Sequence, residues 1–178
     1  LDLLASLKKS ADFLSHFLHP DGSFGGTYGS RSTRFYYPGG VVSLSNKIDS
    51  FNQMKGVLED SILNNLVVNL SSIDEPNLIP LFNSYVRSSV NFEKNNKKTA
   101  LQQETNRYNN PSQLYYPEAG IYLDYGLNHK TIISTYKGGV VYHFSGKNTL
   151  IDSGVLLKNN KGKFASSQNY NKKNIIEI

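Results

Sequence analysis

Cysteine is absent from the 178 residues of this chain. The protein therefore has no disulfides, no thiol nucleophile and no metal site built on thiolates. The sequence also lacks any apolar run that approaches the roughly 20 residues needed for a membrane-spanning helix, so we expect no membrane span. Hydrophobic residues make up only 38% of the chain, which predicts a core with a largely polar coat.

A strong charge of one sign is also missing. The 19 Lys and Arg residues exceed the 14 Asp and Glu residues by enough to give a formal net charge of +5. The basic residues are densest at residues 93–98 and 158–173, and no basic helix or known nucleic-acid motif accompanies them. Such runs are usually solvated loops, so we expect no nucleic-acid partner. The charge balance is consistent with a weak attraction to polyanions, including acidic polysaccharides.

The densest feature that is present is a glycine- and tyrosine-rich segment, residues 21–40. It contains six glycines, three tyrosines and two arginines. Glycine lets a backbone approach a ligand closely, and planar Tyr and Arg side chains suit sugars, uronates and phosphates. The alternative is a structured loop whose aromatic side chains fill a small core of its own.

The segment lies between stretches with helical spacing of apolar residues. Residues 1–19 predict an amphipathic helix that ends at Pro20, and we expect His16 and His19 to cap its last turn. Residues 41–70 predict one or two helices with a break at Asp49. Further helix is expected from residue 75, because a proline follows in its first turn.

A polar run of lysine and asparagine, residues 91–110, separates these helices from a different pattern. Short β-branched and aromatic runs then alternate with turn residues at intervals of about ten residues, which predicts an antiparallel meander and part of a sandwich. Helices followed by strands predict an α+β chain. The predicted segments are a helical segment 1–95, a linker 96–113 and an antiparallel β segment 114–178. The expected strands are residues 120–126, 130–136, 139–144 and 150–152, with others at 154–157 and 174–178.

Two stretches together resemble a known family. One is the segment 21–40, which follows a helix and carries tyrosine among glycines. The other consists of Gly126–Ser134 and the later Asp152–Gly154. It is similar to a pattern in which Gly-His-x-His-x-Asp-x-Leu-Ser is followed by a hydrophobic strand and then by Asp-x-Gly. These features resemble the heparinase II/III-type polysaccharide lyases. His129 and Asp152 keep the family's residue types.

The resemblance implies an α/α-toroid-like helical part followed by an antiparallel β-sandwich-like part, with an active site where the two meet. It implies β-elimination on acidic, uronate-containing glycans. Such a reaction needs a base for the proton α to the carboxylate and a group that stabilises the enolate-like charge. The implied catalytic residues are Tyr36, Tyr37 and His129, and the implied substrate contacts are Tyr28, Arg31 and Arg34, with Tyr28 also a candidate base.

Some lyases of this type hold a zinc ion in the β part, and the resemblance implies His129 and Asp152 as two ligands. Structural zinc needs about four ligands, and the sequence shows no convincing third. The alternative is that the protein binds no cofactor and that His129 is a hydrogen-bonded residue at a strand edge.

Three functions stay open at this stage. The first is a lyase. The second is a non-catalytic relative that binds or assembles a polysaccharide, which Leu127 and Thr131 favour because they replace a histidine and an aspartate of the pattern. The third is a structural module without a ligand. We further expect a periplasmic or extracellular location, and a longer parent protein because a toroid needs more helices.

Overall fold

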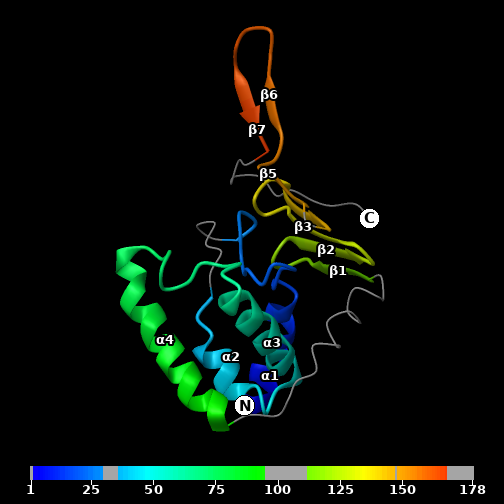
Figure 1. The fold of residues 1–178 in the computed structure, drawn as a ribbon. Coiled ribbons are helices and arrows are strands. Elements are labelled where there is room, and N and C mark those ends of the chain that lie inside the picture. The colour runs from blue at the N-terminus through cyan, green and yellow to red at the C-terminus, as the bar shows by residue number, and fades with distance from the viewer. Residues whose placement is uncertain (1, 30–35, 95–111, 147, 168–178) are drawn as a thin grey trace. The chain divides into compact units, whose positions relative to one another are not determined.

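The computed structural model describes residues 2–29, 36–94, 112–146 and 148–167 (Figure 1). Within these residues, four helices precede a five-stranded antiparallel sheet and a two-stranded hairpin, so the α+β prediction is confirmed. The chain divides into two compact units, and the glycine-rich segment is split between them. The helical unit comprises Leu1–Gly25 and Arg34–Glu104, and the sheet unit comprises Gly26–Thr33 and Thr105–Ile178.

The helices follow the predicted order. They are α1 (Leu3–Ser15), α2 (Gly39–Leu44), α3 (Asp49–Leu63) and α4 (Glu75–Lys94). Asp2 caps α1, because its Oδ1 accepts hydrogen bonds from the backbone N–H groups of Leu4 and Ala5. The break between α2 and α3 confirms two helices in this stretch rather than one. No helix among the described residues is both long enough and apolar enough to cross a bilayer.

The core of the helical unit lies between α1, α2 and α3. Helix α3 contacts α1 and α2, and α2 also packs against α4. Each fully buried Val, Leu, Ile, Phe or Met side chain contributes about 1.5–3 kcal/mol to folding. The buried residues of this core are Ala11, Leu18, Val41, Ile48, Phe51, Met54, Val57 and Leu58.

A tight turn after α1 differs from the prediction. His16 is the C-cap residue, but His19 lies beyond the helix and is only 1% exposed. The expectation that His19 caps α1 was wrong. Its Nε2 instead lies 2.6 Å from the carbonyl oxygen of Gly25, which closes the turn. Asp21 shapes the same turn, because its Oδ1 accepts hydrogen bonds from the N–H and hydroxyl of Ser23.

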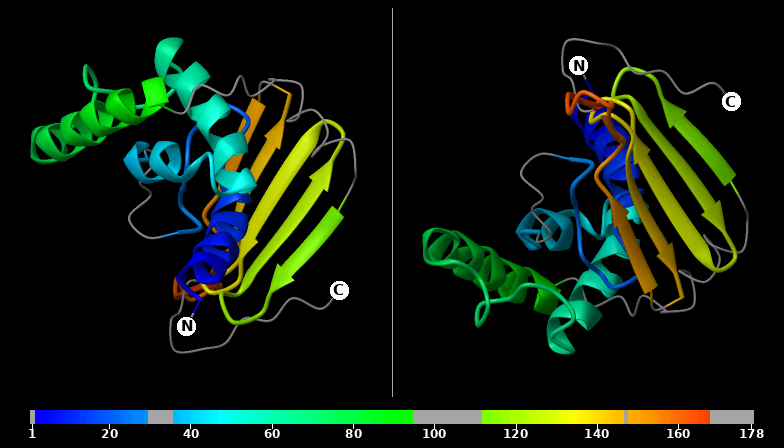
Figure 2. Two further views of the ribbon diagram at one scale, coloured as in Figure 1. Left: turned by 90° about the horizontal axis from the view of Figure 1, so that it is seen from below. Right: turned by 90° about the horizontal axis from the view of Figure 1, so that it is seen from above.

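The five strands form a meander in which each strand pairs with the next (Figure 2). They are β1 (Ser112–Tyr116), β2 (Ile121–Gly126), β3 (His129–Ser134), β4 (Val140–Ser145) and β5 (Asn148–Asp152). A hairpin of β6 (Leu156–Lys158) and β7 (Phe164–Ser166) follows. The meander was predicted, but β1, which begins inside the predicted linker 96–113, and β7 were not. The strand predicted at 174–178 lies outside the described residues.

Successive side chains of a strand point to opposite sides of the sheet, and here the two faces differ in burial and polarity. One face is buried and apolar, with Leu123, Ile132 and Tyr142 fully covered. It also buries Lys130, whose Nζ lies 5.5 Å from the centroid of the Tyr125 ring. The opposite face is only half-buried and carries polar side chains from β2, β3 and β4.

Gly22 should be required for the turn after α1. Its φ of +74° lies in the left-handed region, and a Cβ there would overlap the Ser61 hydroxyl on α3. A left-handed alanine costs about 1–2 kcal/mol before any overlap is counted. We therefore expect Gly22→Ala to lower the free energy of unfolding in urea by at least about 2 kcal/mol.

Gly40→Ala is the matched control. Gly40 lies in α2, and a Cβ there would meet no atom within 4 Å. Alanine in a compatible helical position is neutral or stabilises by up to about 1 kcal/mol. Equal stability of the two variants would contradict the assigned role of Gly22.

Candidate functional site

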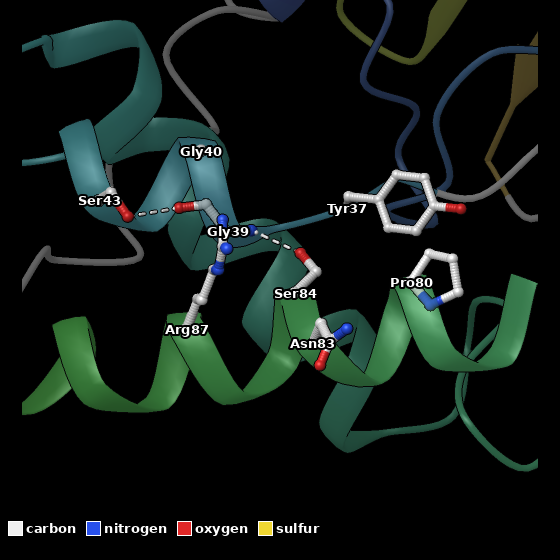
Figure 3. A pocket seen from close by; sticks show the side chains of 8 residues that line it. All are labelled: Tyr37, Gly39, Gly40, Ser43, Pro80, Asn83, Ser84 and Arg87. Atoms are coloured by element: carbon white, nitrogen blue, oxygen red, sulfur yellow. Dashed lines mark hydrogen bonds between the residues drawn. The ribbon is translucent and has the colours of Figure 1, made fainter.

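A groove of about 540 Å³ lies between α2 and α4 and brings one predicted residue, Tyr37, together with polar side chains of α4 (Figure 3). We call it the α2–α4 groove. Helical spacing places its α4 residues on one face of that helix. The groove is lined by Tyr37, Gly39, Gly40, Ser43, Pro80, Asn83, Ser84 and Arg87.

Serine hydroxyls hold the walls of the groove together. The Gly39 N–H donates to Ser84 Oγ at 2.9 Å, which ties the start of α2 to the middle of α4. Ser43 donates to the Gly39 carbonyl at 2.6 Å and accepts from Asn91 Nδ2 at 2.9 Å. These serines are committed to the protein itself, so they shape the groove and leave recognition of a ligand to other side chains.

Tyr37 is held at one end of the groove by a short chain of hydrogen bonds. Its hydroxyl donates to Asn77 Oδ1 at 3.1 Å, and Asn77 Nδ2 donates to Asp74 Oδ2 at 2.8 Å. The side chain of Tyr37 is nevertheless 38% exposed. Its phenol is therefore oriented while part of its surface stays open to the groove.

Arg87 supplies the charge of the groove. It is the only charged residue among the eight that line it, and Figure 3 shows its side chain rising from α4 towards α2. Within the described part of the chain, its guanidinium has no ion-pair partner, and the side chain of Asn83 has no hydrogen-bond partner. A guanidinium and an amide are thus available beside an aromatic ring.

The other two predicted tyrosines serve as packing residues. Tyr36 is half-buried with its ring 4.6 Å from that of Phe24, and burial raises its pKa above the ordinary value, which disfavours the phenolate that a base needs. Tyr28 is 5% exposed and meets Tyr142 edge-on at 5.7 Å. The implied roles of these two tyrosines find no support in their positions.

Arg31 and Arg34, the implied substrate contacts, lie outside the described residues. The sequence did not point to Arg87 or Asn83 as site residues. Their spacing with Pro80 along one helix face was visible, but nothing in the sequence showed that α2 and Tyr37 would pack beside that face.

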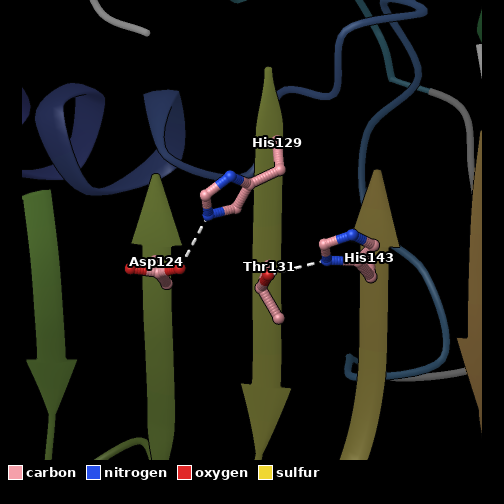
Figure 4. Close-up of polar contacts among 4 residues, drawn as sticks. All are labelled: Asp124, His129, Thr131 and His143. Carbon is pink, nitrogen blue, oxygen red and sulfur yellow. Dashed lines mark hydrogen bonds and ion pairs between the residues drawn. The ribbon is translucent and has the colours of Figure 1, made fainter. Parts of the chain in front are cut away.

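His129 belongs to a row of polar side chains on the half-buried face of the sheet (Figure 4). Its Nε2–H donates to Asp124 Oδ2 at 2.8 Å. On the neighbouring strand, His143 Nδ1 shares a hydrogen bond of 2.8 Å with Thr131 Oγ1. The two imidazole rings lie 5.9 Å apart with 24° between their planes. Strand register produces this row, because Asp124 pairs with Thr131 and Thr131 pairs with His143.

A glycine makes the contact between His129 and Asp124 sterically allowed. Gly126 is the cross-strand partner of His129, and a Cβ on it would overlap the imidazole ring. The ring lies over the strand in the space that the missing side chain leaves. From there it reaches Asp124, two residues earlier on β2.

The structure does not bring His129 and Asp152 together as the implied zinc pair. His129 pairs with Ser145, which pairs with Asn148, so Asp152 lies four residues further along β5, about 13 Å away along the strand. Asp152 is exposed and accepts a hydrogen bond from the Gly154 N–H at 2.8 Å. In the residues that the structure describes, no three His, Cys, Asp or Glu side chains form a metal-binding group.

Comparison of the chain with models of protein families, with curated proteins and with solved structures finds no match. A function therefore has to be argued from the chemistry of the sites.

Gly126→Ala should displace His129 without unfolding the sheet. An added methyl group forces the imidazole out, and the loss of one half-exposed hydrogen bond changes stability by only about 1 kcal/mol. We expect the ring nitrogen signals of His129 in long-range ¹H–¹⁵N spectra to move towards those of Asp124→Asn, which removes the carboxylate. His143 should keep its signals, because its bond to Thr131 is untouched. Unchanged His129 signals in Gly126→Ala would contradict this account of the glycine.

Proposed function

We propose that this protein binds acidic, uronate-containing glycans through the α2–α4 groove. One observation carries the proposal: an exposed aromatic ring and an arginine line the same groove, and none of the carboxylates among the described residues lines it. A tyrosine ring offers an apolar surface with a polar edge, which suits a sugar ring. A guanidinium pairs with a carboxylate through two parallel hydrogen bonds.

The size and charge of the groove support the same ligand class. About 540 Å³ lies within the range of small-molecule sites and is enough for one or two sugar units. Asn83 adds an amide that can both donate to and accept from sugar hydroxyls. The net charge of +5 adds a long-range attraction to polyanions.

A lyase activity is the second candidate, and the ordered position of Tyr37 favours it. In this reaction the Tyr37 phenolate takes the proton α to the uronate carboxylate. The electrons of the broken C–H bond form the double bond, the bond to the glycosidic oxygen breaks, and the Tyr37 hydroxyl gives the proton to that oxygen, which restores the phenolate. Arg87 would pair with the carboxylate and stabilise the charge that develops there. The convergence of His129 with these residues stays a prediction.

The resemblance also leads us to propose the finer fold, an α/α toroid with a β-sandwich. An exposed apolar row on α4 supports the helical part of this proposal, because a toroid would pack further helices against such a row. The row consists of Leu78, Ile79, Phe82, Val86 and Val90, which are 37–64% exposed.

Removal of the Arg87 charge should weaken binding of acidic glycans. We expect Arg87→Gln to reduce the affinity for oligogalacturonate about tenfold or more, because a charge-assisted hydrogen bond contributes about 1.5–3 kcal/mol. Titration calorimetry with oligogalacturonate and with neutral dextran measures the effect. Binding should also weaken as salt is added.

Lys47→Gln is the charge-matched control, because Lys47 is exposed and does not line the groove. It should bind oligogalacturonate as the unchanged protein does. If both variants lost the same affinity for oligogalacturonate, the loss would reflect net charge and not a contact with Arg87. Tight binding of dextran would argue against recognition of the carboxylate.

The lyase candidate makes a separate prediction for Tyr37. If Tyr37 is the base, incubation with oligogalacturonate or alginate should generate the ultraviolet absorbance of unsaturated uronate. Tyr37→Phe should then lower the rate at least about 100-fold while binding persists, since general base catalysis contributes about 10²–10⁴-fold. Tyr36→Phe is the matched control. Binding without any absorbance change would leave the binding proposal standing and remove the lyase.

A further inference from the structure

The hairpin of β6 and β7 (Figure 1) is exposed at every one of its strand residues. Its large apolar side chains, which are 59–66% exposed, are those of Val155, Leu156, Leu157 and Phe164. They lie on both faces of the hairpin, because adjacent residues of a strand point to opposite sides. A two-stranded hairpin is only marginally stable in water by itself, and clustered exposed apolar side chains mark surfaces that bind a protein or a membrane.

Hydrogen bonds hold the hairpin together at both ends. At the turn, Asn159 Oδ1 accepts from the N–H groups of Lys161 and Lys163, each at 2.9 Å. At the base, the Ser167 N–H donates to the Val155 carbonyl oxygen at 2.9 Å, and the Val155 N–H donates to Ser167 Oγ at 2.8 Å. The exposed side chains are therefore carried by a hydrogen-bonded hairpin whose turn is fixed.

The charged side chains of the hairpin are all positive. Residues 154–167 contain three lysines and neither Asp nor Glu. Lys158 pairs across the strands with Phe164, and its Nζ lies 5.4 Å from the centroid of that ring. Lys161 and Lys163 lie at the turn. None of these three lysines forms an ion pair with another described residue, so apolar and cationic groups stand together without an anionic one.

This combination favours one kind of surface as the partner of the hairpin. A second copy of the chain would bring its own lysines against these, and strands of three residues offer only a short edge for pairing. A nucleic acid or an acidic glycan would pair with the lysines but leave the leucine and phenylalanine side chains in water. A bilayer of anionic lipids supplies both partners, because its phosphates attract lysine and its acyl chains accept apolar side chains.

We propose that the β6–β7 hairpin binds the surface of bilayers that contain anionic phospholipids. Leu156, Leu157 and Phe164 enter the boundary between head groups and acyl chains, while the lysine ammonium groups stay at the level of the phosphates. The hairpin lies at this boundary and does not cross the bilayer, because the unpaired backbone groups of its strand edges need polar hydrogen-bond partners. This inference concerns the sheet unit and does not rest on the glycan proposal.

Co-sedimentation of the full chain with lipid vesicles tests the role of charge. Vesicles of phosphatidylcholine and phosphatidylglycerol in equal parts are compared with vesicles of phosphatidylcholine alone. We expect at least about tenfold tighter binding to the mixed vesicles, since each lysine near an anionic surface contributes about fivefold. Added salt should weaken this binding. Absence of binding to the mixed vesicles, or equal binding to both kinds, would overturn the proposal.

A double variant, Lys161→Gln with Lys163→Gln, assigns the charge effect to the hairpin. We expect its affinity for the mixed vesicles to fall about tenfold or more. The matched control is Lys8→Gln with Lys9→Gln, because both lysines are exposed on α1. Equal losses in the two double variants would overturn the proposal. Arg87→Gln should keep vesicle binding even if it loses glycan binding, so the two proposals can fail separately.

An introduced tryptophan reports insertion directly, because the chain contains none of its own. On addition of mixed vesicles, Leu157→Trp should show emission shifted to shorter wavelength and quenching by brominated acyl chains. Leu127→Trp is the matched control, because Leu127 is as exposed as Leu157 but lies between β2 and β3. It should show neither change. An unshifted emission from Leu157→Trp, or equal quenching in the two variants, would overturn the proposal.

Leu157→Ser separates a bilayer from a second copy of the chain as the partner. We expect this variant to bind the mixed vesicles about tenfold more weakly, because an inserted leucine side chain is lost. Its sedimentation velocity without lipid should equal that of the unchanged chain. Dissociation of a lipid-free dimer by this substitution would show that a second copy covers the hairpin, and would overturn the proposal.

Discussion

The contact between α2 and α4 is the constraint on which the α2–α4 groove depends. The Gly39 N–H donates to Ser84 Oγ, and a Cβ at Gly39 would come within 3.1 Å of the same oxygen. The two helices can approach this closely because the first residue of α2 has no side chain. The α2–α4 groove forms along this contact, so a short helix of six residues shapes the proposed binding site.

Some polar side chains of this protein form hydrogen bonds that hold its own elements together, whereas others are available to bind a ligand. Asp21, His19 and Ser84 form hydrogen bonds within turns and helix contacts. Arg87 differs, because it has no carboxylate partner among the described residues. A cationic group without such a partner favours an anionic ligand, which is why an acidic glycan fits the α2–α4 groove.

The glycine-rich segment shows how a dense motif can serve several purposes at once. Part of it closes the turn after α1, part of it belongs to the sheet unit, and Tyr37 alone of its tyrosines has an exposed position in a groove. The aromatic side chains of Tyr28 and Tyr36 match the alternative reading, in which the segment packs its own core. The motif therefore includes both structural residues and one candidate binding residue.

The sequence by itself determined the order and type of most elements, because helices and strands impose local periods on apolar residues. The sequence also marked Tyr37 as a candidate, from the glycine- and tyrosine-rich segment in which it lies. Only the tertiary structure decided which side chains meet. Arg87 joins Tyr37 through helix packing, and His129 reaches Asp124 through strand register and the space over Gly126. Some of these contacts join residues that are far apart in the chain, and others depend on how the surrounding elements pack. The local periodicity of apolar residues cannot predict either kind.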